Sequence, residues 1–188
     1  MPHIRLATGR DGAALAAIYA PAVAESATSF ELVAPDAAEM ARRVERLTER
    51  LPWLVYEEQG VVGAYAYAAP HRDRAAYQWS VEVSAYVGAQ WQRRGIGRRL
   101  YDSLFTTLAE LGYVNAYAGI TLPNPASVGF HTAFGFRVVG TYHGVGHKFG
   151  RWHDVVWLER EIASRPVDPP APHKLNDRSH HSAPTATA

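Results

Sequence analysis

The segment Gln92–Gly97 places two glycines and two arginines between a strand-like run and a helix-like run. Upstream, residues 79–87 alternate apolar and polar side chains, which is the period of a half-buried strand. Downstream, leucines recur at helical spacing from Leu100 to Leu111, and Gly112 ends that pattern. The fold must therefore hold a strand end, a glycine-rich loop and a helix start side by side.

This loop has the chemistry of a pyrophosphate site. Glycine at 95 and 97 lets the backbone approach a ligand and adopt dihedral angles that a Cβ forbids. The first turn of the following helix leaves N–H groups unpaired at the positive end of the helix dipole, which suits phosphate oxygens. Positive charge is added by Arg93, Arg94, Arg98 and Arg99. An ordinary strand–helix turn with a basic flank has the same spacing, so the pattern alone leaves both interpretations open.

Several segments resemble one enzyme family. Gln-x-x-Gly-x-Gly between a strand and a helix is similar to the acetyl-CoA loop of the GNAT N-acetyltransferase superfamily, and the run from Asn124 through His131 to Gly135–Phe136 follows in the usual order. The closest resemblance is to phosphinothricin N-acetyltransferases and their methionine sulfoximine and sulfone relatives. It is carried by Ser29–Glu31, Pro52–Val55, Tyr77–Glu82, Leu122–Ser127 and Gly146–Asp154. The matches spread over about residues 3–162.

The resemblance implies an α/β protein of the α+β type, with the GNAT fold. Its mixed, mostly antiparallel central sheet would have about seven strands and be flanked by about four helices. It also implies acetyl-CoA as co-substrate, a small amino-acid-like substrate and a homodimer. Periodicity and capping residues agree with this order. They predict strands at residues 4–7, 53–56, 61–68, 77–87, 114–120, 136–142 and 153–161. Helices are predicted to begin after Thr8, after Asp36, after the loop Gln92–Gly97 and after Asn124.

Composition sets the limits of the chain. Its 188 residues suffice for one domain with a core, which we place at residues 1–164. Residues 165–188 are rich in proline and poor in apolar side chains, so we expect a disordered tail. The chain has no cysteine, which excludes disulfides, thiolate catalysis and cysteine-based zinc sites.

The charge and hydropathy patterns predict a soluble cytoplasmic protein. A net charge of +1 gives no reason to expect a nucleic-acid partner. The N-terminus lacks a signal-peptide pattern, and no apolar run approaches the ~20 residues that cross a bilayer. We therefore expect no membrane partner.

Acetyl transfer requires that the thioester be held, that the amine lose its proton and that the thiolate be stabilised. Backbone N–H groups of the loop would hold the pyrophosphate, and Val87 matches the position where GNAT backbone pairs with the pantetheine arm. Asn124 is similar to a family Asn that contacts this arm, although it also fits a helix N-cap. The predicted acetyl-CoA contacts are Val87, Gln92, Arg93, Arg94, Gly95, Ile96, Gly97, Arg98, Asn124 and Ser127.

Glu82 lies in the middle of the strand at 77–87, on the face that also carries Ser84 and Tyr86. Spacing alone leaves two interpretations open, a carboxylate on a solvated sheet face or a base held within a site. The resemblance implies the base, because phosphinothricin-type enzymes keep their general base in the segment that matches Tyr77–Glu82. A carboxylate there can accept an ammonium proton directly or through one water.

His131 is the second predicted catalytic residue. It follows Asn124 by seven positions and precedes Gly135 by four. Many GNAT enzymes have Tyr at this spacing, which acts as an acid toward the thiolate, whereas the resembled branch has His. Imidazole titrates near pH 6.5, so it can donate or accept a proton. Its helical phase, close to that of Phe134, also fits a histidine packed in the core, and the resemblance leaves open whether it acts as acid or assists the base.

Substrate recognition is predicted in the polar segment before the Glu82 strand. Arg72 and Arg74 can pair with a carboxylate, phosphinate or sulfone oxygen, although a solvated loop with two arginines has the same sequence. The resemblance adds Tyr77 and Phe30 as pocket residues. It assigns no chemistry to residues 148–154.

The leading hypothesis is an acetyl-CoA-dependent N-acetyltransferase. It would transfer the acetyl group directly to the α-amino group of a small amino acid or analogue, such as phosphinothricin, methionine sulfoximine or methionine sulfone. A GNAT enzyme for another amine, such as a peptide N-terminus or an antibiotic, and a non-catalytic acyl-CoA sensor are the alternatives. No metal is expected, because the mechanism needs none.

Overall fold

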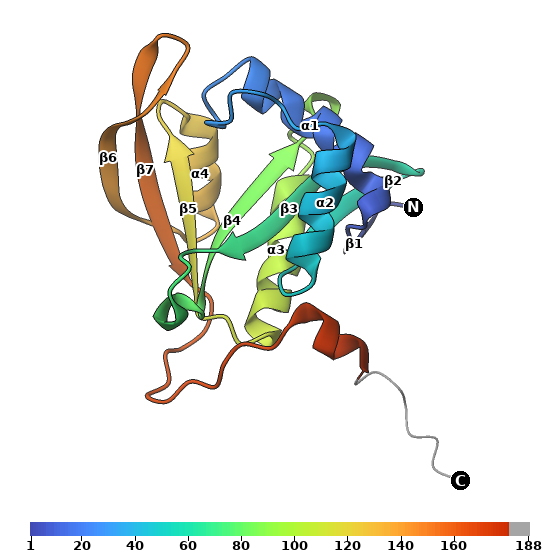
Figure 1. Ribbon diagram of the computed structural model, residues 1–188, viewed down its shortest axis with the longest axis vertical. Coiled ribbons are helices and arrows are strands. Elements are labelled where there is room, and N and C mark those ends of the chain that lie inside the picture. Colours follow the sequence, from blue (N-terminus) through green and yellow to red (C-terminus); the bar gives the residue numbers. More distant parts are fainter. Residues whose placement is uncertain (181–188) are drawn as a thin grey trace.

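A seven-stranded sheet runs through the computed structural model, which describes residues 1–180 (Figure 1). The strand order is β1-β2-β3-β4-β5-β7-β6, and each neighbouring pair is antiparallel except β4 and β5, which are parallel. The strands are β1 (His3–Leu6), β2 (Trp53–Glu58), β3 (Val61–Pro70), β4 (Ser80–Val87), β5 (Asn115–Thr121), β6 (Arg137–Lys148) and β7 (Arg151–Glu161). This mixed, mostly antiparallel sheet confirms the predicted fold class.

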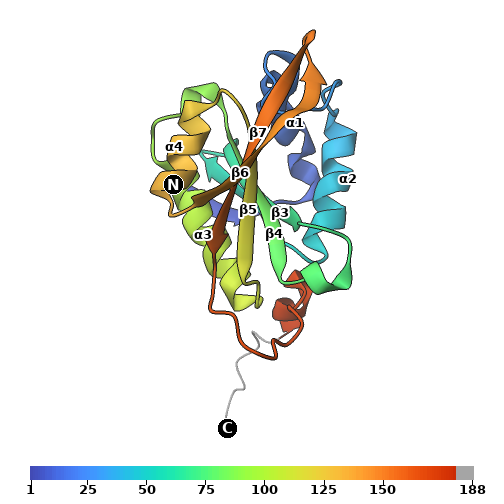
Figure 2. The same ribbon diagram turned by 90° about the vertical axis from the view of Figure 1, so that its left-hand side faces the viewer.

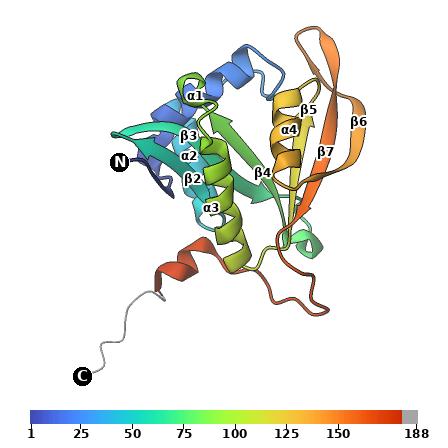
Figure 3. The same ribbon diagram turned by 180° about the vertical axis from the view of Figure 1, so that it is seen from behind.

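Four α-helices in the described residues pack on the sheet, two on each face (Figure 2). They are α1 (Gly12–Ala24), α2 (Ala37–Thr48), α3 (Ile96–Glu110) and α4 (Pro125–Ala133). Short 3₁₀ turns occur at η1 (Gly9–Asp11), η2 (Ala75–Tyr77), η3 (Ala89–Trp91) and η4 (Leu175–His180). The helix α3 crosses one face of the strands (Figure 3), while α1 and α2 cover the other.

Two hydrophobic cores fill the spaces between the layers. On the α3 side, Leu100 and Leu104 pack in one buried cluster with Val81 and Val83 of β4. On the other side, a second cluster joins α1 and α2 to β2 and β3; its buried members are Ala7, Leu15, Tyr19, Val23, Met40, Val44, Trp53, Val55 and Tyr65. Adjacent residues of a strand therefore face different cores, as the pleat requires.

The strands β4 and β5 pair over a short distance and then separate. Pairing covers only Ser80–Glu82 of β4 with Asn115–Tyr117 of β5. Beyond these residues the two strands diverge, which Figures 1 and 3 both show. The backbone of Val83–Val87 therefore has no strand partner on the β5 side, and its N–H and C=O groups there are not used in pairing with β5.

Capping residues set the helix boundaries that the sequence predicts. The side chain of Asp36 accepts a hydrogen bond of 2.7 Å from the backbone N–H of Glu39 at the start of α2. The residues just after α3 and α4 include Gly112 and Gly135, with φ angles of +89° and +90°. Only glycine adopts this left-handed backbone without steric cost, so both helices end where predicted.

The largest differences from the predicted strand bounds lie in β4, β6 and β7. The strand predicted from Tyr77 begins at Ser80, because Tyr77 belongs to η2. The last two strands form one long hairpin with a tight turn at Phe149–Gly150, whereas the sequence predicted a break between residues 142 and 153. A register shift between Tyr142 and Gly146 interrupts the alternation on which the strand prediction depended.

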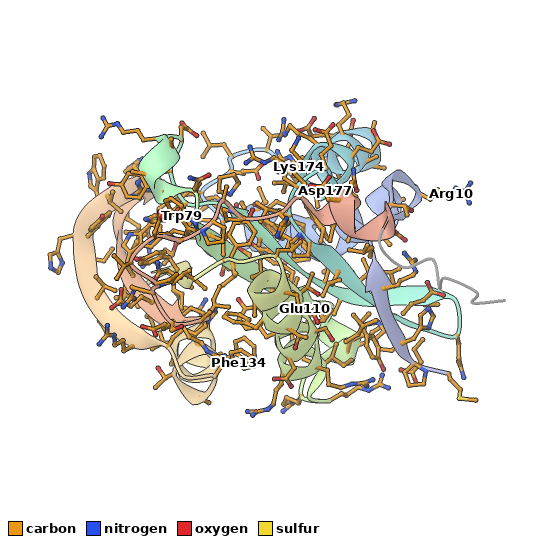
Figure 4. All side chains as sticks on the ribbon, turned by 90° about the horizontal axis from the view of Figure 1, so that it is seen from below. Arg10, Trp79, Glu110, Phe134, Lys174 and Asp177 are labelled. Carbon is orange, nitrogen blue, oxygen red and sulfur yellow. The ribbon has the colours of Figure 1, made fainter. Side chains whose placement is uncertain are left out.

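Residues 165–180 lie against the lower end of the domain (Figures 1 and 4). The indole Nε1 of Trp79 donates a hydrogen bond of 2.7 Å to the carbonyl oxygen of Pro170. Leu175 is buried in the same core as the α3 leucines. These contacts use one apolar side chain and a few backbone groups. The proline-rich composition of this segment, from which we predicted disorder, does not indicate them.

The division of the chain into a domain of residues 1–164 and a disordered tail of residues 165–188 stays a prediction. Within it, residues 181–188 lie outside the described part of the chain. In the described residues, no helix has both the length and the apolar composition that a bilayer span needs.

Candidate active site

The helix α3 begins without a side-chain cap. Its N-cap, Gly95, has a φ of +71°, and neither a capping side chain nor an acidic residue lies in the first turn. A Cβ placed on Gly95 would meet no atom within 4 Å, so the space beside this turn is open. The unpaired N–H groups of the first turn are therefore available to an anion at the positive end of the dipole. This arrangement fits a diphosphate.

Neighbouring side chains partly engage the arginines of the loop. The guanidinium of Arg94 forms an ion pair of 2.7 Å with Glu58 and lies 4.8 Å from the ring centroid of Trp91. Arg93 has a left-handed backbone with a φ of +58°. Arg98 lies on the first turn of α3, where its charge adds to the helix dipole.

The loop is also tied to the end of β4. The amide nitrogen of Gln92 donates a hydrogen bond of 3.4 Å to the carbonyl oxygen of Val87. Ile96 is buried and anchors the helix start in the core. At Gly97, a Cβ would lie 3.5 Å from Phe130 and 3.9 Å from Val87, so the helix start lies close to both β4 and α4. The structure therefore groups the predicted acetyl-CoA residues of β4 and α3.

Asn124 is the N-cap of α4. Its side-chain oxygen accepts a hydrogen bond of 3.0 Å from the backbone N–H of Ser127. The amide nitrogen of the same side chain can still donate to a ligand, so capping and a cofactor contact use different atoms. The hydroxyl of Ser127 lies 3.5 Å from Nδ1 of His131.

Glu82 lies on the face of β4 that is turned away from α3. Its neighbours Val81 and Val83 are buried in the core with Leu100. Because alternate side chains of a strand point to opposite faces, Glu82 points to the side covered by α1 and α2. Glu82 is also the last residue of β4 that pairs with β5, where its partner is Tyr117. The carboxylate therefore belongs to the point where the two strands separate.

Two nitrogen donors contact one oxygen of this carboxylate. Nδ1 of His71 lies 3.0 Å from Oε1 of Glu82, and Nη1 of Arg72 lies 3.4 Å from the same oxygen. The Glu82 side chain is 34% exposed, so water and a small ligand can reach it. Both donors contact the same oxygen, Oε1, of Glu82.

The predicted substrate residues lie in two places. Arg72 contacts Glu82, and its guanidinium lies 5.9 Å from the ring centroid of Trp157 on β7. Tyr77 lies in η2 with its ring 6.0 Å from that of His71. Arg74 is exposed in the same segment. The structure thus brings Arg72 and Tyr77 into the surroundings of Glu82.

Phe30 comes from the loop between α1 and α2. Its ring lies against Gly146 of β6, where an added Cβ would overlap the ring. The ring centroid lies 6.2 Å from that of His153 on β7. Phe30 is 38% exposed, so part of its ring remains available to a ligand.

Tyrosines occupy the same sheet face as Glu82. Tyr67 pairs across the strands with Ser84, and Tyr65 pairs with Tyr86. Burial raises the pKa of Tyr65, Tyr67 and Tyr86, so their hydroxyls stay neutral at physiological pH. A cavity of 340 Å³ beside α2 includes Tyr65 and Tyr67 in its wall. This face therefore offers hydroxyl groups without adding negative charge.

His131 lies on the opposite side of the sheet, between α3 and α4. It is 6% exposed, and aromatic rings surround it. Nδ1 lies 2.8 Å from the carbonyl oxygen of Ser127, and Nε2 lies 2.9 Å from the hydroxyl of Tyr101. Because a carbonyl only accepts, Nδ1 carries the hydrogen and Nε2 accepts from Tyr101. These contacts describe a packed histidine with both nitrogens paired, and its catalytic role stays a prediction.

Burial lowers the pKa of His131 below its ordinary value of 6.5. Below pH 6.5 the unfolded chain then binds a proton that the folded chain does not, so stability should fall as the pH falls from about 6.5 toward the folded pKa. Each unit by which the pKa is lowered corresponds to about 1.4 kcal/mol. Urea unfolding at several values between pH 8 and pH 5.5 measures this loss.

The matched variant is His131→Asn, which lacks the titrating ring. Its unfolding free energy should change less between pH 8 and pH 5.5 than that of the unaltered protein. A wild-type stability that is constant or rises as the pH falls in this window would contradict the lowered pKa.

Sequence reasoning missed three side chains near Glu82, namely His71, Tyr117 and Trp157. No sequence signal pointed to His71. It lies beside the carboxylate because Ala69 pairs with Glu82 in the hairpin of β3 and β4, a register that only the structure shows. In the described residues, no three His, Asp or Glu side chains come together as metal ligands.

Comparisons with known proteins identify the family of this chain. The acetyltransferase (GNAT) domain family matches residues 4–157. A phosphinothricin N-acetyltransferase of Streptomyces viridochromogenes is 39% identical over 171 residues, which cover 89% of this chain and 93% of the relative. An L-methionine sulfoximine/L-methionine sulfone acetyltransferase of Salmonella typhimurium is 34% identical over 85% of this chain and 94% of its own.

A solved structure has the same fold. It is a GNAT superfamily phosphinothricin acetyltransferase from Sinorhizobium meliloti in complex with acetyl-CoA. The TM-score is 0.83 at 32% identity, and the alignment covers 89% of this chain and 94% of the other. With the family match over most of its length, the uncapped α3 start and the strand separation at Glu82, this chain belongs to the GNAT acetyltransferase family and is an N-acetyltransferase.

Proposed function

We propose that this enzyme uses acetyl-CoA to acetylate the α-amino group of a small amino acid or amino-acid analogue. Phosphinothricin, methionine sulfoximine and methionine sulfone define the substrate class. The observation that carries the proposal is the position of Glu82, a partly exposed carboxylate where β4 and β5 separate. The printed names of the relatives support the substrate class.

The start of α3 and the free edge of β4 would hold acetyl-CoA. N–H groups of the first turn would take the diphosphate, with Arg98 adding charge. Backbone groups of Val83–Val87 would pair with the amide groups of the pantetheine arm, since no strand occupies that edge. When bound there, acetyl-CoA supplies a thioester whose acyl carbon accepts the amine.

Glu82 would act as general base. Its free oxygen accepts a proton from the substrate ammonium group, so the nitrogen gains the lone pair that forms the new C–N bond. The C–S bond breaks, and the departing sulfur leaves as thiolate. His131 stays a predicted catalytic residue, and its two ring nitrogens contact Tyr101 and Ser127.

Arg72 would orient the substrate. Its guanidinium lies beside the base and is 46% exposed, so it can also pair with a carboxylate or phosphinate of the substrate. Tyr77 and Phe30 each present a partly exposed ring that could contact the substrate. Arg74 adds positive charge to the same segment, and it stays a predicted contact.

The long hairpin supports the predicted homodimer. The strands β6 and β7 and their turn expose Val139, Val145, Phe149 and Trp152, each more than half exposed. Apolar side chains gathered on one hairpin suit a second copy of the chain. A cytoplasmic location and the lack of nucleic-acid or membrane partners stay predictions.

A thiol-release assay tests the proposal. Purified protein with acetyl-CoA should release free thiol on addition of phosphinothricin, methionine sulfoximine or methionine sulfone. Free amino acids test the breadth of the class, and N-terminal peptides test the alternative amine. The matched control is each amine already acetylated at nitrogen, which should release nothing.

A thermal shift assay tests acetyl-CoA binding separately from the choice of amine substrate. Acetyl-CoA at 100 times its Kd should stabilise the fold by about 2.7 kcal/mol, which raises Tm by roughly 5–10 °C for a chain of this size. A thermal shift without thiol release on any of these amines would retain the acetyl-CoA site and reject the substrate class.

A further inference from the structure

His71 is the closest partner of the candidate base. It lies just after β3, in the segment that leads to η2. Its Nδ1 is 3.0 Å from Oε1 of Glu82, and its backbone N–H donates to the carbonyl oxygen of Ser80 at 3.4 Å. Because a carboxylate only accepts, Nδ1 carries the hydrogen in this contact. The imidazole therefore donates to the carboxylate.

Aromatic side chains from three elements hold the imidazole in place. Its ring stacks on Tyr117 of β5, with centroids 4.3 Å apart and an angle of 19° between the planes. The edges of Tyr77 in η2 and Trp157 in β7 lie at centroid distances of 6.0 and 6.1 Å. The His71 side chain is only 13% exposed. Such packing restricts the ring more than a solvated loop histidine.

Arg72 also contacts this carboxylate. Its contact with Oε1 is longer, at 3.4 Å, and its side chain is 46% exposed. A long contact on an exposed side chain is weak, because water competes with it. The shorter, shielded contact with His71 is therefore the one that fixes the orientation of the Glu82 carboxylate.

We propose that His71 is a positioning residue for acetyl transfer. Its Nδ1–H holds Oε1 of Glu82, so that the second oxygen, Oε2, is directed to the amine and accepts its proton. This inference rests on the proposed function, in which Glu82 is the base. The ring of His71 stacks on Tyr117 of β5. In this role His71 orients the Glu82 carboxylate and does not itself transfer a proton.

Two variants separate the donor from the ring. His71→Phe keeps a ring that can stack on Tyr117 but removes the donor. His71→Asn loses the ring but keeps an amide nitrogen in the position of Nδ1. A misplaced base can cost about 10²-fold in rate, so we expect kcat to fall at least about tenfold in His71→Phe, with KM for acetyl-CoA unchanged within about twofold. His71→Asn should stay within about threefold of wild type.

The loss of kcat caused by His71→Phe should disappear when Glu82 has already been replaced. In a Glu82→Gln background, His71→Phe should lower kcat no further, because there is no carboxylate left to orient. Thermal melting of each variant confirms that it folds. Equal kcat in wild type and His71→Phe would overturn the inference while leaving the proposed function intact. A loss in His71→Asn as large as that in His71→Phe would also overturn it, because an amide donor in the position of Nδ1 would then fail to preserve activity.

A readout that needs no turnover tests the contact itself. Long-range ¹H–¹⁵N spectra of the wild type should show His71 protonated at Nδ1, and Glu82→Ala, which removes the acceptor, should reduce that tautomer. Protonation at Nε2 alone would overturn the inference. A wild type that releases no thiol with any amine would instead reject the proposed function, and these spectra would still decide whether His71 orients Glu82.

Discussion

Replacing Glu82 by Gln should lower kcat by about 10²-fold or more, the range over which a positioned general base contributes. The amide has the size of the carboxylate but cannot take the ammonium proton. Hydrogen bonding at Oε1 can survive, because the amide oxygen still accepts from His71 and Arg72. The fold and acetyl-CoA binding should therefore remain, and the loss should appear in kcat.

Steady-state kinetics by thiol release, together with the acetyl-CoA thermal shift, measure both quantities. Glu161→Gln is the matched control, because that carboxylate is exposed and pairs with Arg165 at the end of β7. It should leave kcat unchanged. Turnover in Glu82→Gln equal to that of the control would remove Glu82 from the role of base.

Replacing Lys148 by Met should destabilise the fold and weaken substrate binding. Lys148 is 5% exposed, and its ammonium donates to the carbonyl oxygens of Val23, Ser26 and Ser29 at 2.6, 3.1 and 2.7 Å. All three N–H donors are used. The contact with Val23 places the positive charge at the C-terminal end of α1, where the helix dipole favours a cation.

Methionine would leave these carbonyl oxygens without their donor. Each unsatisfied buried group costs about 1–3 kcal/mol, so a total of at least about 3 kcal/mol is expected. This corresponds to a drop in Tm of roughly 6–12 °C for a chain of this size. The loop from Glu25 to Asp36 carries Phe30, so KM for the amine should rise with little change in KM for acetyl-CoA.

Thermal melts and substrate titrations check both effects. Arg151→Met is the control, because it removes an exposed cation from the same hairpin. Its Tm should stay within about 2 °C of wild type. If Lys148→Met had the same Tm as Arg151→Met, the Lys148 ammonium would not stabilise the loop between α1 and α2.

Local sequence signals predicted most elements of the fold. Helix boundaries follow from side chains within one turn, as in the cap at Asp36 and the glycines after α3 and α4. The buried stripe of α2 follows from helical period, with Met40 and Val44 in the core. The glycine-rich loop and the strand of Glu82 were likewise readable from spacing.

The bounds that failed are those that depend on distant partners. The strands β6 and β7 continue through glycine positions because each strand is paired with the other along its length. The register shift between Tyr142 and Gly146 interrupts the alternation of apolar and polar side chains, so the sequence pattern does not show one continuous strand. Tyr77 reads as a strand residue by alternation, but the chain turns at η2 before β4 begins. Leu175 is a lone apolar residue in a polar segment, and only its contact with the domain shows that it is buried.

Signals within a few residues of one another suffice to predict the glycine-rich loop before α3, the carboxylate in β4 and the order of the elements. Three features follow from the three-dimensional fold alone: the separation of β4 and β5 just after Glu82, the contact of His71 with its carboxylate, and the contact of Lys148 with the end of α1. These contacts join residues far apart in the chain. They depend on sheet register and packing, which no local pattern records.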